Sequence, residues 1–392
     1  MRKLIRGRYL ALAGLAVLVG VLVAPAVGVS KSSSGLPTSI GKGEGALSLI
    51  EWPAYSDPSF AKPFEKSTGC KITRKDAGSS NEMFNLMHAG GGGGGGQYDL
   101  VSASGDASLR LIFAGDVVPI NVSLIPSWKD FLPAFKSPPH NTINGVHYGL
   151  SLQWGPNTLL YNTKKIKPAP TSWAAIYDPK YKGQIEVPNN PIQIADAALY
   201  LQKTKPALGI KDPYELTKPQ FDAVVALLKQ QKGLLKRYWV YAADEVKDFK
   251  SGDATIGASW PYQTVTLKAA HVPVKELIPK EGATGWADTW MLAKRAPHPN
   301  CAYMWMKYVA TPKVQAQQAI AFGGETPVNP KACPFMNKLQ PGSCAEYHLN
   351  APASYSKSIR FWKSPVAACG WGGRKDCMDI QAWNNAWASI TG

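Results

Sequence analysis

The alternation of short apolar segments with amphipathic helical segments between residues 46 and 113 constrains the fold more than any other feature. Apolar runs predict strands at residues 46–50, 71–74 and 99–102, and helical spacing predicts helices between and after them. The first helix is expected to begin near Pro58 and to end at Gly69. This β-α-β-α-β order predicts a parallel sheet with helices on its faces, and therefore an α/β fold.

A second series of strands and helices begins near Ser151. Strands are expected at residues 184–187 and 254–259, and helices at 191–203 and from residue 218 onward. The chain has 392 residues, which exceeds the size at which a single hydrophobic core usually stops growing. Two lobes are therefore expected, followed by a C-terminal segment rich in Pro, Cys and Trp.

The N-terminus has the pattern of a secretory signal peptide. Four basic residues among the first eight precede an almost wholly apolar run, Leu10 to Val23, and the small residues Ala24-Pro25-Ala26 follow it. Residues 1–30 are interpreted as a signal peptide and the Ser/Gly/Lys-rich residues 31–45 as a flexible linker. An uncleaved membrane anchor is the alternative. Either way the protein is expected to be exported, to the periplasm or the extracellular space.

The chain is basic, with 43 Lys and Arg against 27 Asp and Glu and a formal net charge of +16. Residues 1–30 hold four of the basic residues and no acidic ones, so the remainder carries 39 − 27 = +12. No Lys/Arg run resembles a nucleic-acid-binding tail, so no nucleic-acid partner is expected. Solubility explains the charge most simply, and attraction to an anionic surface or ligand is the alternative.

Six cysteines in an exported chain indicate disulfide bonds, although six cysteines allow fifteen pairings. Two pairs would close short loops, Cys333–Cys344 and Cys369–Cys377, which leaves Cys70–Cys301 by elimination. No metal site is expected, because there is no C-x-x-C motif and the six histidines are scattered. No cofactor is expected either.

Several short segments occur in an informative order along the chain. They are residues 51–55 (EWPAY), 97–101 (QYDLV), 161–163 (YNT), 171–173 (TSW), 177–183 (YDPKYKG), 278–282 (IPKEG) and 326–329 (TPVN). Together they resemble the spermidine/putrescine-binding branch of extracellular solute-binding proteins. The resemblance covers about residues 46–330, and its specificity lies in the order and spacing of the segments.

The resemblance implies a two-lobed periplasmic-binding-protein fold of the type II kind, with a hinge of crossing strands and a ligand enclosed in the cleft. The hinge is expected near Gln153 and Gly285. Lobe one then comprises residues 46–150 and 287–330, and lobe two comprises residues 151–286. Residues 331–392 form a disulfide-stapled C-terminal segment that is expected to pack mainly on lobe two.

The family's pocket is an aromatic box with acidic residues at its ends, which suits an alkylammonium chain. The matching positions in this sequence are Trp52, Tyr55, Ser104, Trp260, Trp286 and Asp288. Two positions where the family usually has acids are instead the neutral Asn190 and Gln193. These two also fit an N-cap and a capping box, with Pro191 at the first helical position. Asp106 either restores one carboxylate or caps the helix that begins near Ala107.

These observations predict a non-enzymatic protein that binds a small amine-bearing, polyamine-like solute and delivers it to an ABC transporter permease in the membrane. A zwitterionic or anionic organic solute is the alternative, because acids are missing and helix N-termini can hold anionic groups. A hydrolase is disfavoured, because no G-x-S-x-G, H-E-x-x-H or EF-hand motif occurs. The protein is expected to be a monomer.

Overall fold

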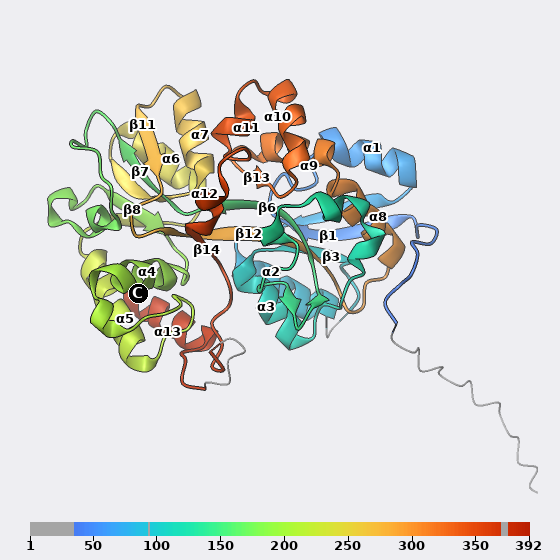
Figure 1. Cartoon of the computed structure of the whole chain (residues 1–392), viewed down its shortest axis with the longest axis horizontal. Coiled ribbons are helices and arrows are strands. Elements are labelled where there is room, and N and C mark those ends of the chain that lie inside the picture. Colours follow the sequence, from blue (N-terminus) through green and yellow to red (C-terminus); the bar gives the residue numbers. More distant parts are fainter. Residues whose placement is uncertain (1–34, 93–94, 370–374) are drawn as a thin grey trace, which may run out of the picture. The chain divides into compact units, whose positions relative to one another are not determined.

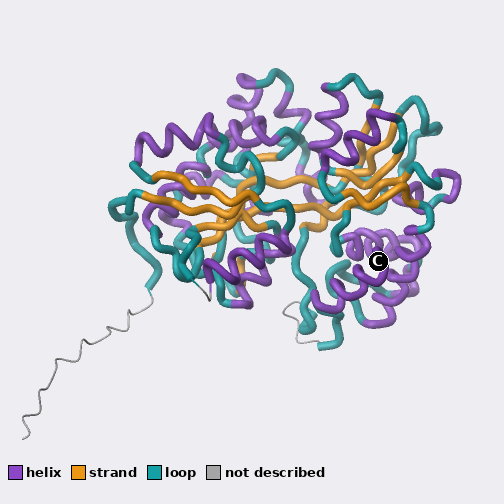
Figure 2. The backbone as a smooth tube through the Cα atoms, turned by 180° about the vertical axis from the view of Figure 1, so that it is seen from behind, coloured by secondary structure: helices purple, strands orange, loops and turns teal. Residues whose placement is uncertain are grey.

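The structure, a computed structural model, describes residues 35–92, 95–369 and 375–392. The expected signal peptide lies outside these residues, and so do the first residues of the expected linker. Two sheets, each covered by helices, organise the part of the chain from Leu36 to Gly392 (Figures 1 and 2). The α/β fold class expected from the sequence is confirmed.

The first sheet has seven strands in the order β13-β6-β12-β3-β1-β2, with β14 beside β12. Its strands are β1 (Ala46–Glu51), β2 (Lys71–Asp76), β3 (Leu100–Ala103), β6 (Leu150–Pro156), β12 (Ala283–Leu292), β13 (Thr326–Pro327) and β14 (Ile359–Phe361). Its helices are α1 (Pro58–Thr68), α2 (Ser80–Met87), α3 (Gly105–Ala114), α8 (Pro299–Val309) and α9 (Pro312–Phe322). Strand β1 is parallel to both β2 and β3, as the β-α-β-α-β order predicts. A separate two-stranded sheet joins β4 (Thr142–Ile143) and β5 (Val146–His147).

Helix α1 illustrates how local sequence sets the ends of these elements. The Asp57 side chain accepts a hydrogen bond from the backbone N–H of Ser59 at 2.9 Å, and Pro58 occupies the first helical position. Gly69 ends the helix with a φ of 76°, a left-handed conformation that glycine adopts without steric cost. Both ends agree with the sequence analysis.

The second sheet has five strands in the order β11-β7-β10-β8-β9. Its strands are β7 (Thr158–Asn162), β8 (Ile185–Pro188), β9 (Leu235–Trp239), β10 (Ile256–Ser259) and β11 (Val274–Leu277). Its helices are α4 (Gln193–Thr204), α5 (Lys218–Lys232), α6 (Ala242–Ser251) and α7 (Pro261–Ala269). Strand β8 is parallel to β9 and β10, whereas β7 is antiparallel to β10 and β11.

The chain passes from the first sheet to the second between β6 and β7 and returns between β11 and β12. Strands β6 and β12 pair with each other, and Gly285 lies opposite Pro156. A Cβ atom at Gly285 would lie 2.6 Å from the backbone oxygen of Gly155, so this close approach requires glycine. The expected lobe boundary at residues 150/151 falls at the start of β6, and the boundary at 286/287 falls inside β12. Both strands belong to the first sheet, so each expected boundary divides a strand and not a connection between the sheets.

The C-terminal segment contacts elements of both sheets. Its helices are α10 (Cys333–Leu339), α11 (Ser343–Glu346), α12 (Ala353–Lys357) and α13 (Ile380–Thr391). Helix α10 packs on α9, β14 runs parallel to β12, and α13 packs on α5. Trp383 and Trp387 of α13 are both buried, as their spacing on one helix face predicts. The segment therefore passes from the first sheet to the helices of the second (Figure 1).

Three disulfide bonds join the cysteine pairs expected from the sequence. The Cα–Cα distances are 5.8 Å for Cys70–Cys301, 5.1 Å for Cys333–Cys344 and 5.2 Å for Cys369–Cys377. Cys70–Cys301 connects the end of α1 to α8 over 231 positions of sequence. The other two lie within the C-terminal segment.

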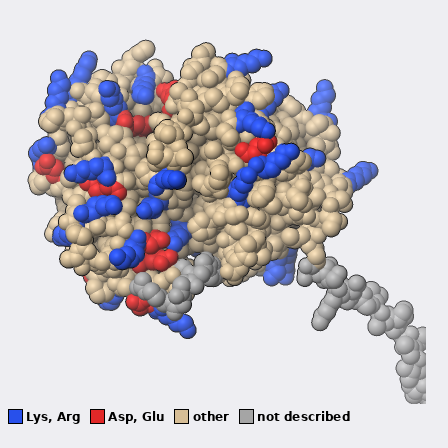
Figure 3. Space-filling view, in the orientation of Figure 1, with Lys and Arg blue, Asp and Glu red and all other residues tan. Residues whose placement is uncertain are grey.

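Lys and Arg side chains are spread over the face shown in Figure 3, with Asp and Glu between them. Among the helices that the structure describes, none combines the length and the apolar character needed to cross a membrane.

Candidate functional site

A pocket lies where segments of both sheets meet, and its empty volume is about 690 Å³ when the space open to solvent is included. Several of its residues directly follow the carboxyl ends of β1, β3, β8 and β10, which is where ligands bind in open α/β sheets. Six aromatic side chains line it, namely Trp52, Trp239, Trp260, Trp286, Phe322 and Trp362. The polar side chains that line it are Ser79, Ser80, Ser104, Asn189, Asn190, Asp288 and Glu325.

Strand pairing fixes the positions of Trp52 and Trp286, which come from the end of strand β1 and from strand β12 of the first sheet. Trp52 follows β1, and its backbone N–H donates to the Ser102 hydroxyl of β3 at 3.1 Å. Trp286 lies on β12 against Gly155 of β6, where a Cβ atom would approach the indole ring to 2.5 Å. Glycine at this position therefore makes room for the ring.

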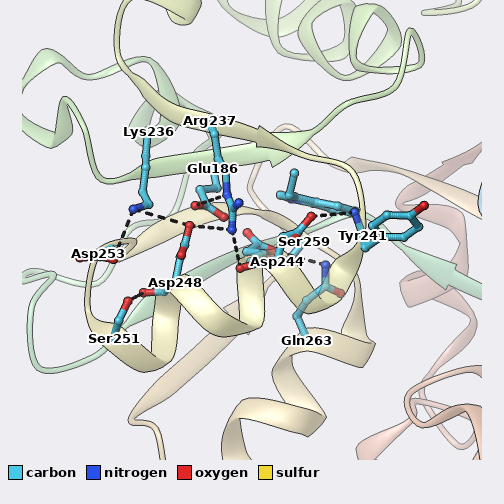
Figure 4. A network of polar contacts seen from close by, with 12 residues as sticks. Glu186, Lys236, Arg237, Tyr241, Asp244, Asp248, Ser251, Asp253, Ser259 and Gln263 are labelled. Carbon is cyan, nitrogen blue, oxygen red and sulfur yellow. Dashed lines mark hydrogen bonds and ion pairs between the residues drawn. The ribbon is translucent and has the colours of Figure 1, made fainter.

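A polar network supports the segment that contains Trp260. Figure 4 shows two of its members, Ser259 and Gln263. The buried carboxylate of Glu245 accepts hydrogen bonds from the Ser259 hydroxyl at 2.8 Å and from the Gln263 amide at 3.1 Å. These two residues flank Trp260, whose backbone N–H donates to the Gln263 side chain at 3.2 Å. The Trp260 ring also meets Trp239 edge to face, with ring centroids 4.7 Å apart.

Glu245 belongs to helix α6, and ion pairs connect strand β9 to this helix and to strand β8 (Figure 4). Arg237 contacts Glu186 at 3.3 Å and Asp248 at 2.8 Å, and Lys236 contacts Asp248 at 3.6 Å. Burial raises the pKa of Glu186 to about 8, and it raises the pKa of Glu245 well above its usual range. Glu245 supports the pocket wall through its hydrogen bonds to Ser259 and Gln263.

A second buried network, centred on Asp196 of α4, supports the pocket where the two sheets join. Asn157 donates to Asp196 at 3.0 Å and to Thr284 at 2.9 Å, and Thr284 also hydrogen-bonds to Asp196. Two pocket tryptophans attach to this network through their indole N–H groups, Trp260 to Asn157 at 3.1 Å and Trp362 to Thr284 at 3.1 Å. Burial raises the pKa of Asp196 to about 6.

The acidic part of the pocket contains two carboxyl groups on either side of one tyrosine hydroxyl. The Tyr55 hydroxyl hydrogen-bonds to Asp288 and lies 2.5 Å from Oε1 of Glu325. The Ser104 hydroxyl donates to the other oxygen of Asp288. Burial raises the pKa of Asp288 to about 7, and burial together with the Asp288 charge raises the pKa of Glu325 well above its usual range.

Six of the nine sequence-predicted ligand residues line this pocket. They are Trp52, Ser104, Asn190, Trp260, Trp286 and Asp288. Tyr55 is fully buried behind the wall and contacts the pocket only through its hydrogen bonds to the two acids.

Asp106 and Gln193 do not line the pocket. Asp106 is buried and accepts a hydrogen bond from the Ser80 hydroxyl at 2.7 Å, so Ser80 lies between it and the pocket. It is not a helix cap either, because α3 begins at Gly105 after Ser104.

The Gln193 amide donates to Asp196 at 2.6 Å, so it belongs to the buried network and not to a capping box. Asn190 accepts from the Ile192 N–H at 3.0 Å, two residues ahead of it, which explains why α4 begins later than expected.

The sequence analysis missed Glu325, Trp239, Phe322, Trp362 and Asn189. Glu325 immediately precedes the TPVN segment, but acidic residues are common and no motif distinguishes this one. Trp362 reaches the pocket from the C-terminal segment, because the backbone N–H of Trp362 donates to Gly285 at 2.7 Å and continues the pairing of β14 with β12. No local pattern could indicate that long-range pairing.

Comparisons with known proteins agree with this geometry. Residues 59–339 match the family model described as bacterial extracellular solute-binding protein. The chain is 23% identical over 283 residues to the spermidine/putrescine-binding periplasmic protein of Escherichia coli K12, covering 72% of this chain and 77% of that one.

Solved structures show the same fold. The spermidine/putrescine ABC transporter substrate-binding protein of Streptococcus pneumoniae superimposes with a TM-score of 0.67 at 16% identity, over 88% of this chain and 97% of that one. A periplasmic binding protein from A. tumefaciens B6, in complex with glucopine, gives a TM-score of 0.65 at 17% identity, over 87% of this chain and 99% of that one. The family model covers well over half of the chain, and the chain therefore belongs to the bacterial extracellular solute-binding proteins.

Proposed function

We propose that this protein binds a small amine-bearing, polyamine-like solute in the pocket between its two sheets and delivers it to an ABC transporter permease. The observation that carries the proposal is the presence of buried acids within a box of aromatic rings. Asp288 is 3% exposed and lies in the same pocket as Trp52, Trp260 and Trp286. Ring faces attract cations and cover methylene groups, while a buried carboxylate fixes a charged nitrogen.

The charge of the pocket favours a cation. Neither Asp288 nor Glu325 forms an ion pair with a basic side chain anywhere in residues 35–92, 95–369 and 375–392. An unpaired buried carboxylate is costly, and a cationic ligand would supply the missing partner. The spermidine/putrescine-binding relatives support the same class of ligand.

We further propose that the elements of the two sheets act as lobes that close on the solute. Two contacts across the pocket support this idea. Gly78, before α2, faces the ring of Tyr241 at the start of α6, and the Phe322 and Tyr262 rings lie 5.8 Å apart. Hinge closure around a ligand is a common motion of periplasmic binding proteins. On this proposal the protein works as a monomer, without nucleic acid and without chemical turnover.

A zwitterionic solute is a second candidate, favoured by one observation. The indole N–H of Trp286 is buried in the pocket wall and has no hydrogen-bond partner among the residues that the structure describes. An acceptor oxygen on the ligand would satisfy it. Asn190, at the second-sheet side of the pocket, is neutral and can meet either a donor or an acceptor.

A thermal-shift screen of the purified protein tests the proposal. The panel contains mono-, di- and polyamines, amino acids, sugars and organic phosphonates. Amines should raise the melting temperature in a concentration-dependent way, because a ligand that binds only the folded state stabilises it. Mass spectrometry after denaturation should return the ligand unchanged. Stabilisation by anions alone would refute the amine assignment, and a chemically altered ligand would refute the binding-protein assignment.

A further inference from the structure

Glu325 occupies a position in the pocket that the resemblance did not indicate. The turn Gly323-Gly324 carries it there from the end of α9. Gly324 has a φ of 101°, and a Cβ atom on it would lie 2.7 Å from the backbone nitrogen of Tyr262. This close approach to α7 brings the Glu325 side chain to the junction of the two sheets, where it is completely buried.

One oxygen of Glu325 is unsatisfied. Oε1 contacts the Tyr55 hydroxyl, whereas Oε2 has no hydrogen-bond partner among the described residues. The nearby Gln318 amide favours the charged form of Glu325, although it forms no hydrogen bond of standard geometry with either oxygen of Glu325. A buried acid that lines a pocket with a free oxygen is available to a donor on a ligand.

The Tyr55 hydroxyl has one hydrogen and two carboxyl neighbours. It can donate to only one of them, so the other contact requires a proton on the second carboxyl group. Asp288 already receives the Ser104 hydroxyl, which favours its ionised form. The arrangement of hydrogen atoms that satisfies these contacts is a protonated Glu325 that donates to Tyr55, which in turn donates to Asp288.

The ionisable residues around Asp288 and Glu325 agree with a structure in which one of these two carboxyl groups keeps its proton. Besides Tyr55, the ionisable group whose charge acts on Asp288 is Asp106 of α3, and the one whose charge acts on Glu325 is Asp288 of β12. Tyr347 of the C-terminal segment also faces Glu325, and burial raises its pKa. Among the described residues no basic side chain forms an ion pair with either acid, so two adjacent carboxylates would repel each other.

We propose that Glu325, Tyr55 and Asp288 form a proton-sharing site for one nitrogen head with several N–H donors, a primary ammonium or a guanidinium, and that the head expels the shared proton on binding. The proton leaves the Glu325 carboxyl group for the solvent, and the ligand cation replaces it between two carboxylates. The inference rests on the proposed function and refines it. A quaternary ammonium would suit the aromatic rings but could not donate to the two carboxylates.

Calorimetry with 1,4-diaminobutane at pH 8, where Asp288 is mostly ionised, counts the protons released on binding when it is run in two buffers of different ionisation enthalpy. Wild-type protein should release close to one proton per ligand. Glu325→Gln should bind on the order of 10- to 100-fold more weakly and release fewer protons. Glu325→Asp, which keeps a carboxyl group, should retain the release. Glu51→Gln removes a buried acid outside the pocket and should behave as wild type.

The trimethylammonium analogue of butylamine, compared with butylamine itself, provides the second arm. Butylamine should bind more tightly, because it alone donates N–H groups. If wild-type protein binds 1,4-diaminobutane but Glu325→Gln binds with unchanged affinity and proton release, the assignment of Glu325 is wrong and the proposed function stands. Equal or tighter binding of the quaternary ion also overturns the assignment. If wild-type protein binds no amine, the proposed function fails and this inference fails with it.

Discussion

Replacing Asp288 with Asn removes the negative charge on which amine binding is proposed to depend while keeping the shape of the side chain. An ammonium about 3.5 Å from a carboxylate, at an effective dielectric constant of about 20, gains roughly 5 kcal/mol of Coulomb energy. Desolvation offsets part of this gain, and truncating one partner of a buried charge pair typically costs about 2–5 kcal/mol. We therefore expect Asp288→Asn to weaken amine binding by about 30- to 5,000-fold.

Isothermal titration calorimetry at pH 8 is the appropriate assay. The pKa of Asp288 is about 7, so the wild-type carboxyl group is mostly ionised at that pH and the full charge is compared with none. Glu51→Gln is the matched control. Glu51 is a buried acid of the first sheet whose carboxyl group accepts a hydrogen bond from Ser56 and does not line the pocket. It should change the affinity by less than about threefold, which is under about 0.7 kcal/mol.

Asn190→Asp tests the opposite change on the far side of the pocket. It adds a carboxylate where the structure has a neutral amide, and it should alter amine affinity less than Asp288→Asn does. A diamine gains from the added charge only if its second nitrogen reaches that side of the pocket. If Asp288→Asn leaves the affinity unchanged or tightens it, Asp288 does not anchor the ligand and an anionic solute becomes the better hypothesis.

Three further predictions concern stability and the aromatic wall. Because the pKa of Asp288 is raised from 3.8 to about 7, the folded protein retains a proton that the unfolded chain releases, so stability is lost as the pH rises through this window. The free energy of unfolding of the wild type, minus that of Asp288→Asn, should fall by about 1.4 kcal/mol per pH unit between about pH 4 and 7. If urea denaturation gives the same pH dependence of this free energy for both proteins, the prediction is wrong. Replacing Cys70 and Cys301 together with Ala should cost about 5 kcal/mol in the same assay, because the bond closes a loop of 231 positions, and an unchanged midpoint would refute it. Trp260→Phe should weaken amine binding by about 3- to 30-fold, whereas Trp173→Phe, outside the pocket, should leave the calorimetric affinity unaltered.

Local sequence predicted the elements whose ends and faces are set locally. Asp57 and Gly69 mark the ends of α1 because capping and left-handed backbone depend only on neighbouring residues. The spacing of Trp383 and Trp387 alone indicated that they share one face of a helix, and this face is buried. The short strands β13 and β14 carried no such signal, since they form only by pairing with distant strands of the first sheet.

The residues of the candidate site fall into the same two groups, those that the sequence could indicate and those that depend on tertiary contacts. Trp52, Trp260 and Asp288 follow or lie on predicted strands or hinge segments, so the family resemblance could indicate them, and all three line the pocket. Gln193 could not be placed from sequence, because its direction depends on the buried carboxylate of Asp196 three residues later and on the fold around it. Glu325 depends on a tight approach of Gly324 to α7, which is a tertiary contact.

A crystal structure of the protein with 1,4-diaminobutane tests the central claim most directly. The account predicts the diamine inside the pocket between the two sheets, with its chain against Trp260 and Trp286 and one nitrogen about 3 Å from the Asp288 carboxylate. A diamine bound elsewhere on the protein, or bound in the pocket with neither nitrogen within hydrogen-bond distance of Asp288, would contradict it.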